Sequence, residues 1–412
     1  MYKKIGLAIF VLVVAAAIAL FTLNGPEGTE RAEAVRDLDG RLVEANLHFG
    51  FELFQKLYPE DPEKNTVISP TSISMALAMT YQGAGGETRD AMAKALALTD
   101  MDLDAYNEAN SDLLTILTHR GDAVENRFAN SLWKRQEYDF RDAFVNAARD
   151  YFGAQTQSLD FDDPAAAQTI NNWVKEKTGG KIEDIVDDDI DPDTIMFIIN
   201  ALYFQGDWTH PFDEASTVEQ DFYRPDGRTD TVPMMVRQGE MAYLERDAFQ
   251  AVRLPYGEEE RFSMYVFLPN EDLGPAGLID RLEPEQWNDW MGAFSKQEGR
   301  LRLPRFTAEY EGELEDALTD MGMGLAFDRQ QANFENMRSI PPVVYLKSVR
   351  HKTFIEVDET GTEAAAATSV EVGIESAPMD AFDMEVNRPF VFAIRDDVTG
   401  TVLFMGSIVD PE

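Results

Sequence analysis

Residues 349–368 read VRHKTFIEVDETGTEAAAAT, and this stretch combines two conformational preferences. Gly361 tolerates backbone angles that other residues rarely adopt, and the β-branched Thr362 favours an extended chain. Glu363 and the four alanines after it, Ala364–Ala367, are instead good helix sequence. These alanines also carry little side-chain bulk or rotamer entropy. The stretch therefore predicts a segment that can take different local structures in different states of the molecule.

Apolar runs elsewhere predict strands mixed with helices. Ile195–Ile199 is apolar throughout, as expected of a strand buried on both faces, and Phe262–Pro269 and Phe390–Ile394 are similar. Helical spacing of apolar residues marks four further segments, Leu42–Leu57, Ile73–Gln82, Gln168–Glu176 and Leu314–Met321. No internal repeat and no regular alternation of strand and helix is visible. The pattern predicts an α+β fold.

Motifs of catalysis and metal binding are missing from the sequence. Gly83–Gly86 resembles a phosphate-binding loop only weakly, because it lacks GxxxxGK and a preceding strand, and we interpret it as a helix stop. GxSxG and HExxH do not occur, and the four histidines are far apart. The absence of cysteine excludes disulfides, thiolate metal sites and a cysteine nucleophile. We therefore expect no enzyme activity, no metal and no cofactor.

The 412-residue chain is strongly acidic. Its 36 basic and 75 acidic residues give a net charge of −39, which disfavours binding to nucleic acid, anionic lipid or a heparin-like polyanion. Two interpretations of this charge remain: a well-solvated surface, or adaptation to high salt, where repulsion among carboxylates is screened. Equal stability in chemical denaturation at low and molar salt would exclude the second interpretation.

Residues 1–23 predict export from the cytoplasm. Lys3 and Lys4 precede the uncharged run Ile5–Leu23, whose nineteen residues would span close to 30 Å as a helix, the thickness of a bilayer core. Ala17-Ile18-Ala19 also offers a signal-peptide cleavage site, so the segment is either a signal peptide or a membrane anchor. The two lysines favour the cytoplasmic side. We expect an extracellular or cell-surface protein that meets the membrane only through residues 5–23, if these are retained.

Four stretches after residue 41 carry motifs in a fixed order. They are Asn65–Ile73 with Gly83–Thr88, Asn200–Trp208 with Pro211-Phe212, Val349–Thr368, and Asn387–Phe392 with Leu403–Gly406. Together they resemble the serpin family of serine protease inhibitors, in its prokaryotic and inhibitory form. The resemblance implies a single serpin domain over residues 41–412, preceded by a linker over residues 24–40. It also implies three β-sheets, about nine helices and an exposed reactive-centre loop, with hinge and loop at about residues 359–386.

The resemblance further implies an inhibitor that acts as a suicide substrate. A serine protease attacks the loop and forms an acyl-enzyme, and the cleaved loop then inserts as a new strand into the central sheet and traps the protease. Small residues would enter on one face of that strand, since Thr362, Ala364, Ala366 and Thr368 alternate. The implied hinge residues are Glu359, Gly361, Thr362, Glu363, Ala364, Ala365, Ala366, Ala367 and Thr368.

A non-inhibitory serpin, acting as a binding or carrier protein, is the alternative. Such serpins usually carry proline, charge or bulky residues in the hinge. The hinge of this chain has only Glu363, which inhibitors also carry, and inhibition is therefore favoured.

Counting in the register of inhibitory serpins puts the reactive bond at Glu375–Ser376. The fourteen residues from Thr362 to Glu375 would carry an acylated protease about 46 Å along the sheet, at about 3.3 Å per residue. Glu375 as the specificity residue implies a glutamate-preferring serine protease. The count leaves the bond open by one or two residues, which makes Ile374 the rival specificity residue and an elastase- or subtilisin-like protease the rival target.

Two further groups of residues match positions that control the sheet in serpins. A buried polar cluster is implied behind the strands, and its members must satisfy one another, because each unsatisfied group costs about 1–3 kcal/mol. A loop-entry site is implied at the end of the sheet where insertion begins. The sheet-opening cluster maps to Ser69, Ser72, Asn200 and His351, and the loop-entry site to Trp208, Arg305 and Glu359.

Overall fold

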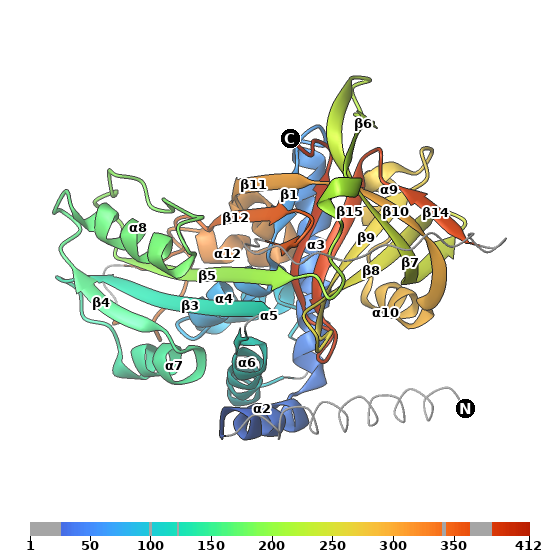
Figure 1. Cartoon of the computed structure of the whole chain (residues 1–412). Coiled ribbons are helices and arrows are strands. Elements are labelled where there is room, and N and C mark those ends of the chain that lie inside the picture. The colour runs from blue at the N-terminus through green and yellow to red at the C-terminus, as the bar shows by residue number, and fades with distance from the viewer. Residues whose placement is uncertain (1–25, 99–100, 122, 340–342, 363–380) are drawn as a thin grey trace.

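The computed structural model describes residues 26–98, 101–121, 123–339, 343–362 and 381–412 (Figure 1). The signal or anchor expected over residues 1–23 lies outside these ranges. So do the hinge from Glu363 to Thr368 and the bond Glu375–Ser376. Within the described ranges, no helix combines the length and the apolar character needed to cross a bilayer.

The first sheet has nine strands, in the order β1, β16, β15, β9, β8, β7, β10 and β14, with β6 also paired to β7. Their bounds are β1 Thr66–Ile68, β6 Val218–Tyr223, β7 Thr229–Arg246, β8 Phe249–Tyr256, β9 Phe262–Pro269, β10 Ser295–Pro304, β14 Phe382–Glu385, β15 Phe390–Asp396 and β16 Val402–Ile408. All neighbours are antiparallel except β10 and β14.

Two of the three expected sheets are joined into this one. The cause is the long strand β7, whose residues 229–234 pair with β6 and whose residues 242–246 pair with β8. The strand β10 pairs with β7 over residues 234–243 and so links the two parts. The hydrogen-bonded ladder therefore continues from one expected sheet into the next.

The second sheet has the order β11, β12, β13, β5, β3 and β2, with β4 parallel to β3. Its strands are β2 His119–Arg120, β3 Val124–Arg135, β4 Gln155–Leu159, β5 Met196–Asp207, β11 Phe306–Glu313, β12 Arg350–Val357 and β13 Gly361–Thr362. With helices packed on both of its faces, the structure confirms the α+β prediction.

Helices separate and cover the sheets. The helix α4 contacts both β5 and β16, and so lies between the two sheets, while α8 packs against β3 and β5 on the opposite face (Figure 1). The bounds are α3 Gly40–Leu57, α4 Pro70–Tyr81, α5 Gly86–Ala95, α6 Leu103–Leu117, α7 Asp142–Phe152, α8 Ala166–Lys177, α9 Gly274–Ile279, α10 Pro284–Ala293, α11 Glu315–Leu318 and α12 Gly324–Phe327. Short turns of other helix types are η1 Tyr58–Glu60, η2 Glu214–Ser216 and η3 Thr319–Met323.

The linker expected over residues 24–40 is wrong for most of its length, because Pro26–Asp37 forms the helix α2. The helix packs on α6, where Ala32 and Val35 are buried in one apolar cluster with Ile116. The first turns of α2 are polar in sequence, so the sequence did not indicate an apolar face in this segment. The folded body therefore begins before residue 41.

Replacing Val35 by alanine tests whether α2 is part of the folded body. Loss of its buried side chain should lower the free energy of unfolding by about 1–2 kcal/mol. Glu33→Ala is the matched control, because Glu33 is exposed on the same helix. Denaturant titration measures both variants, and equal stability of Val35→Ala and Glu33→Ala would contradict the docking of α2.

Candidate functional site

Within the described residues, one strand position of the second sheet is filled only at one end. β13 is two residues long and lies between β12 and β5, antiparallel to both. Thr362 stands opposite Val357 of β12 and Gly206 of β5. Beyond Thr362, the described chain places no strand between β5 and β12. We call this gap the open strand position.

A cavity of about 370 Å³ occupies the far part of the open strand position. Residues 196–200 of β5 line one wall and residues 343–351 line the other, while α4 and the segment between α8 and β5 close the two faces. The strand predicted at Ile195–Ile199 is confirmed, but its burial on both faces is not. Only Ile199 is buried, because the cavity lies where a neighbouring strand would cover the other residues.

The turn into β13 depends on close packing at Gly361. A side-chain carbon at this position would lie 2.1 Å from the main-chain oxygen of Gly206, so only glycine fits. Its φ is not positive, and close approach rather than an unusual backbone angle is therefore the reason for glycine here. The carboxylate of Asp358 accepts hydrogen bonds from the main-chain N–H groups of Thr360 (2.8 Å) and Gly361 (3.1 Å), which fixes the turn.

Thr362 is held by an aromatic pair at the end of the sheet. Its hydroxyl shares a hydrogen bond of 2.6 Å with the hydroxyl of Tyr256, and Trp208 stacks on Tyr256 with ring centroids 4.4 Å apart. The indole N–H of Trp208 donates to the carbonyl of Asp358 at 2.9 Å. Sequence motifs pointed to Trp208 and Thr362 but gave no sign of Tyr256, which lies in no recognisable pattern.

The expected pair of Arg305 and Glu359 is formed beside this turn. Arg305 Nη2 donates to both carboxylate oxygens of Glu359 at 2.8 Å, and the hydroxyl of Thr217 donates to Oε1 at 2.6 Å. Burial opposes ionisation of Glu359, but these hydrogen bonds outweigh it and hold its pKa below the ordinary value. Through these contacts the buried carboxylate of Glu359 joins the hinge to the turn between β10 and β11 and to the segment before β6, and the pair is not a fully exposed surface pair.

The four residues expected to form a polar cluster lie together behind the open strand position. Ser69 donates its N–H to His351 Nε2 at 3.0 Å, and Ser72 donates its N–H to Ser69 Oγ at 3.2 Å. The hydroxyl of Ser72 donates to Asn200 Oδ1, and Asn200 Nδ2 donates to Asn130 Oδ1 at 2.6 Å. Asn130, on β3, was missed because a lone asparagine within a strand carries no motif. The cluster therefore connects α4, β3, β5 and β12.

Burial lowers the pKa of His351 to about 3. Its Nε2 accepts a hydrogen bond, so the imidazole is neutral with its proton on Nδ1. Protonation of His351 would break the bond to Ser69 and leave a charge between the sheets.

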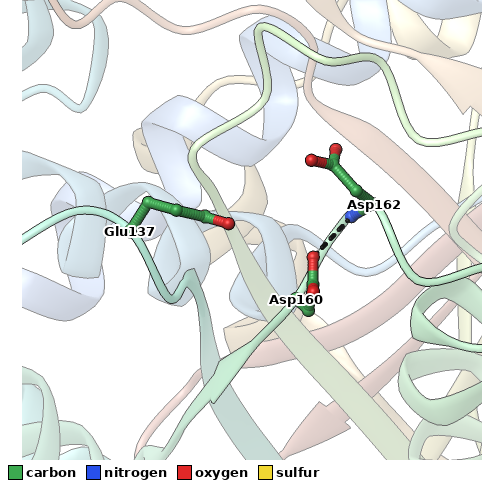
Figure 2. A group of neighbouring side chains, drawn as sticks. All are labelled: Glu137, Asp160 and Asp162. Carbon is green, nitrogen blue, oxygen red and sulfur yellow. Dashed lines mark hydrogen bonds between the residues drawn. The ribbon is translucent and has the colours of Figure 1, made fainter.

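Among the described residues, one group of acidic side chains is close enough to share a cation: Glu137, Asp160 and Asp162 (Figure 2). All three are exposed, and the N–H of Asp162 donates to Asp160 Oδ1 at 3.1 Å. Arg135 Nη1 already pairs with Asp162 at 2.7 Å, so a guanidinium supplies positive charge here. We assign no cation to this group.

The buried imidazole predicts a pH dependence of stability. Below about pH 6.5 the unfolded chain gains a proton on His351 that the folded chain does not bind, so this residue's contribution is present above pH 6.5 and is lost as the pH falls towards 3. The variant His351→Gln keeps an acceptor for the Ser69 N–H but does not titrate. Between pH 7.5 and 4.5, we expect the wild type to lose about 2 kcal/mol more than the variant.

Urea titration at the two pH values measures this difference. The other histidines cancel, since both proteins contain them. An equal loss of stability in the two proteins would contradict a neutral, buried His351.

Comparison with known proteins identifies the family. The model of the family Serpin (serine protease inhibitor) matches residues 44–411. An uncharacterized serpin-like protein of Thermococcus kodakarensis is 35% identical over 384 residues, which cover 90% of this chain and 86% of that protein. The native state of tengpin, a thermophilic serpin, matches with a TM-score of 0.83 and 32% identity over 90% of this chain and 95% of tengpin.

A thyroxine-binding globulin in complex with thyroxine also matches, with a TM-score of 0.80 and 26% identity over 90% of this chain and 99% of that chain. The shared fold therefore includes a relative whose structure holds a small-molecule ligand. The expected serpin fold is confirmed by these structures. This chain belongs to the serpin family, most of whose members inhibit serine proteases and are not catalysts.

Proposed function

We propose that this chain inhibits a serine-type endopeptidase as a suicide substrate, trapping the acyl-enzyme by inserting its cleaved loop into the second sheet. The observation that carries the proposal is the open strand position. The first hinge residues already lie in it: Thr362 pairs with both flanking strands, and Gly361 pairs with β5.

The register of β13 supports insertion along the whole gap. If the loop continues in this register, Ala364 would come opposite Ile355 of β12 and Phe204 of β5. These two residues and Thr362 line a small cavity, which would accept a methyl side chain. Six residues beyond Thr362, Thr368 would come between His351 and Asn200 of the buried polar cluster. Its hydroxyl suits that polar environment.

The later part of the loop has the composition of a strand for the large cavity. Thr368, Val370, Val372 and Ile374 alternate onto the face that Thr362 buries, and Glu371 and Glu375 fall on the other face. In the same register, Val370 and Val372 would lie beside residues 196–198 of β5, which are half-buried in the present state. Covering these apolar residues provides a driving force for insertion.

We propose a glutamate-preferring protease as the target, because Glu375 occupies the specificity position. An elastase- or subtilisin-like protease is the second candidate, with Ile374 in that position. Both follow from the loop sequence alone.

A carrier function is the alternative, favoured by the match to thyroxine-binding globulin in its thyroxine complex. The two functions differ in the outcome of loop cleavage. A carrier would be cleaved without forming a covalent complex.

A panel of glutamyl endopeptidase, subtilisin, elastase and chymotrypsin tests the proposal, and Thr362→Arg tests its mechanism. The wild type should give a band near the summed masses on denaturing gels. The variant must bury a charge between β5 and β12, so the fraction converted to complex should fall at least about tenfold in favour of cleaved protein.

Thr229→Arg makes the same change at an exposed position and should inhibit like the wild type. A Thr362→Arg variant that still traps protease would contradict insertion. Loop cleavage of the wild type without complex, by every protease tested, would favour the carrier.

The position of the reactive bond is a separate prediction. The C-terminal fragment released from the denatured complex should begin at Ser376, because Glu375 is the acylated residue. Its mass identifies its first residue. A fragment that begins at Glu375 would assign the specificity position to Ile374 instead.

A further inference from the structure

The segment between α8 and β5 lies over the open strand position. We call its residues 181–193 the strap. Ile185 and Val186 pack with Ile199 of β5 in the apolar cluster under α8. The side chain of Asn171 in α8 accepts hydrogen bonds from the N–H groups of Ile185 and Val186, both at 3.0 Å, and donates to the carbonyl of Val186 at 2.8 Å. One edge of the strap is therefore fixed to α8 and to β5.

The other edge of the strap is joined to the far side of the gap by ion pairs. A series of ion pairs joins the strap to β12, to the segment before β12 and to the loop after α12. The pairs are Lys181–Glu356 (3.2 Å), Asp184–Lys352 (2.7 Å), Asp187–Arg350 (2.7 Å), Asp191–Lys347, and Asp193–Arg329 (3.2 Å).

The strap thus bridges the two strands that must accept a new strand between them. It also lines the cavity on the face opposite α4. A strand that enters the gap changes the distance between β5 and β12. The strap contacts both strands, so it cannot keep both sets of contacts when this distance changes. We propose that the ion pairs of the strap form an electrostatic clasp that slows strand insertion, and that salt concentration sets the rate by screening it.

The exposure of the ion pairs makes them sensitive to salt. The carboxylates of Asp184 and Asp187 are about 70% exposed, and exposed pairs are screened within a Debye length of about 10 Å at 0.1 M salt. The Arg350 guanidinium holds the pKa of Asp187 below its ordinary value, so the pair is ionised at neutral pH. The clasp is therefore closed at low salt and weakened at high salt.

The basic partners do not depend on the strap for their own pairing. Lys352 also contacts Glu311 at 2.9 Å, and Arg350 also contacts Glu313 at 3.3 Å, both on β11. Removing the strap carboxylates therefore leaves no unpaired cation, and the double variant Asp184→Asn/Asp187→Asn should fold. Asp188→Asn/Asp189→Asn is a matched control. It makes the same change of charge on the strap, at exposed residues with no ion pair in the described ranges.

The inference rests on the proposed function. Annealing of a loop peptide tests the clasp and the proposed function separately, because each has its own contradicting outcome. The probe is the synthetic peptide QAAAATSVQVGIQ, which is residues 363–375 with each glutamate replaced by glutamine and both ends blocked, because the chain's own Thr362 already fills the first position. Because it is uncharged, salt does not change its attraction to the acidic protein. Its association with the intact full chain is followed by tryptophan fluorescence and native gel mobility at 50 mM and 1 M NaCl.

At 50 mM NaCl, the Asp184→Asn/Asp187→Asn variant should bind the peptide about three- to tenfold faster than the wild type and the control variant. At 1 M NaCl the three rates should converge. Equal rates for the paired and control variants at 50 mM NaCl would overturn the clasp and leave the proposed function intact. Failure of the peptide to anneal to any of the three proteins would overturn both.

Discussion

The open strand position between β5 and β12 is the constraint on which the other features of this molecule depend. A sheet normally buries its apolar residues and pairs its main-chain groups with a neighbouring strand. Here residues 196–198 of β5 are apolar and half-buried. On the side of β5 that faces β12, the described chain supplies a partner strand only at Gly361–Thr362, whereas β3 pairs along the other side. Among the described residues the fold thus leaves a vacancy, and a strand there would cover these apolar side chains.

The surroundings of this vacancy keep it accessible to the hinge. Gly361 approaches Gly206 too closely for a side chain, the bond from Tyr256 fixes Thr362, and Arg305 holds Glu359. Behind the vacancy, the polar cluster around His351 and Asn200 replaces the apolar packing that would otherwise join β5 and β12 to α4. Polar partners of this kind can exchange hydrogen bonds when the strands move. The strap lies over the other face, and the proposed clasp of ion pairs slows the entry of a strand without preventing it.

Much of this architecture was predictable from sequence, because motifs and apolar periodicity report local structure. The α+β class and the strand at Ile195–Ile199 follow from such patterns, whereas the meeting of Ser69, Ser72, Asn200 and His351 was implied by the resemblance to the serpin family. Tyr256, Asn130 and the strap ion pairs did not, since they arise from contacts between distant segments with no local signature. Helix α2 was mistaken for a linker because its apolar side is formed by few residues. The half-burial of β5 was missed because an apolar run does not show whether a strand lies beside it, and the described chain places none beside residues 196–198 on the side facing β12.

The most direct test of loop insertion measures amide hydrogen exchange along β5 and β12 before and after cleavage of the loop. Insertion predicts slow exchange near Gly206 and Val357 in both states, where β13 already pairs. Toward residues 196–200 of β5 and 350–353 of β12, exchange should be faster in the intact protein and become strongly protected after cleavage. Unchanged exchange in these segments, despite complete cleavage, would contradict insertion of the loop into the open strand position.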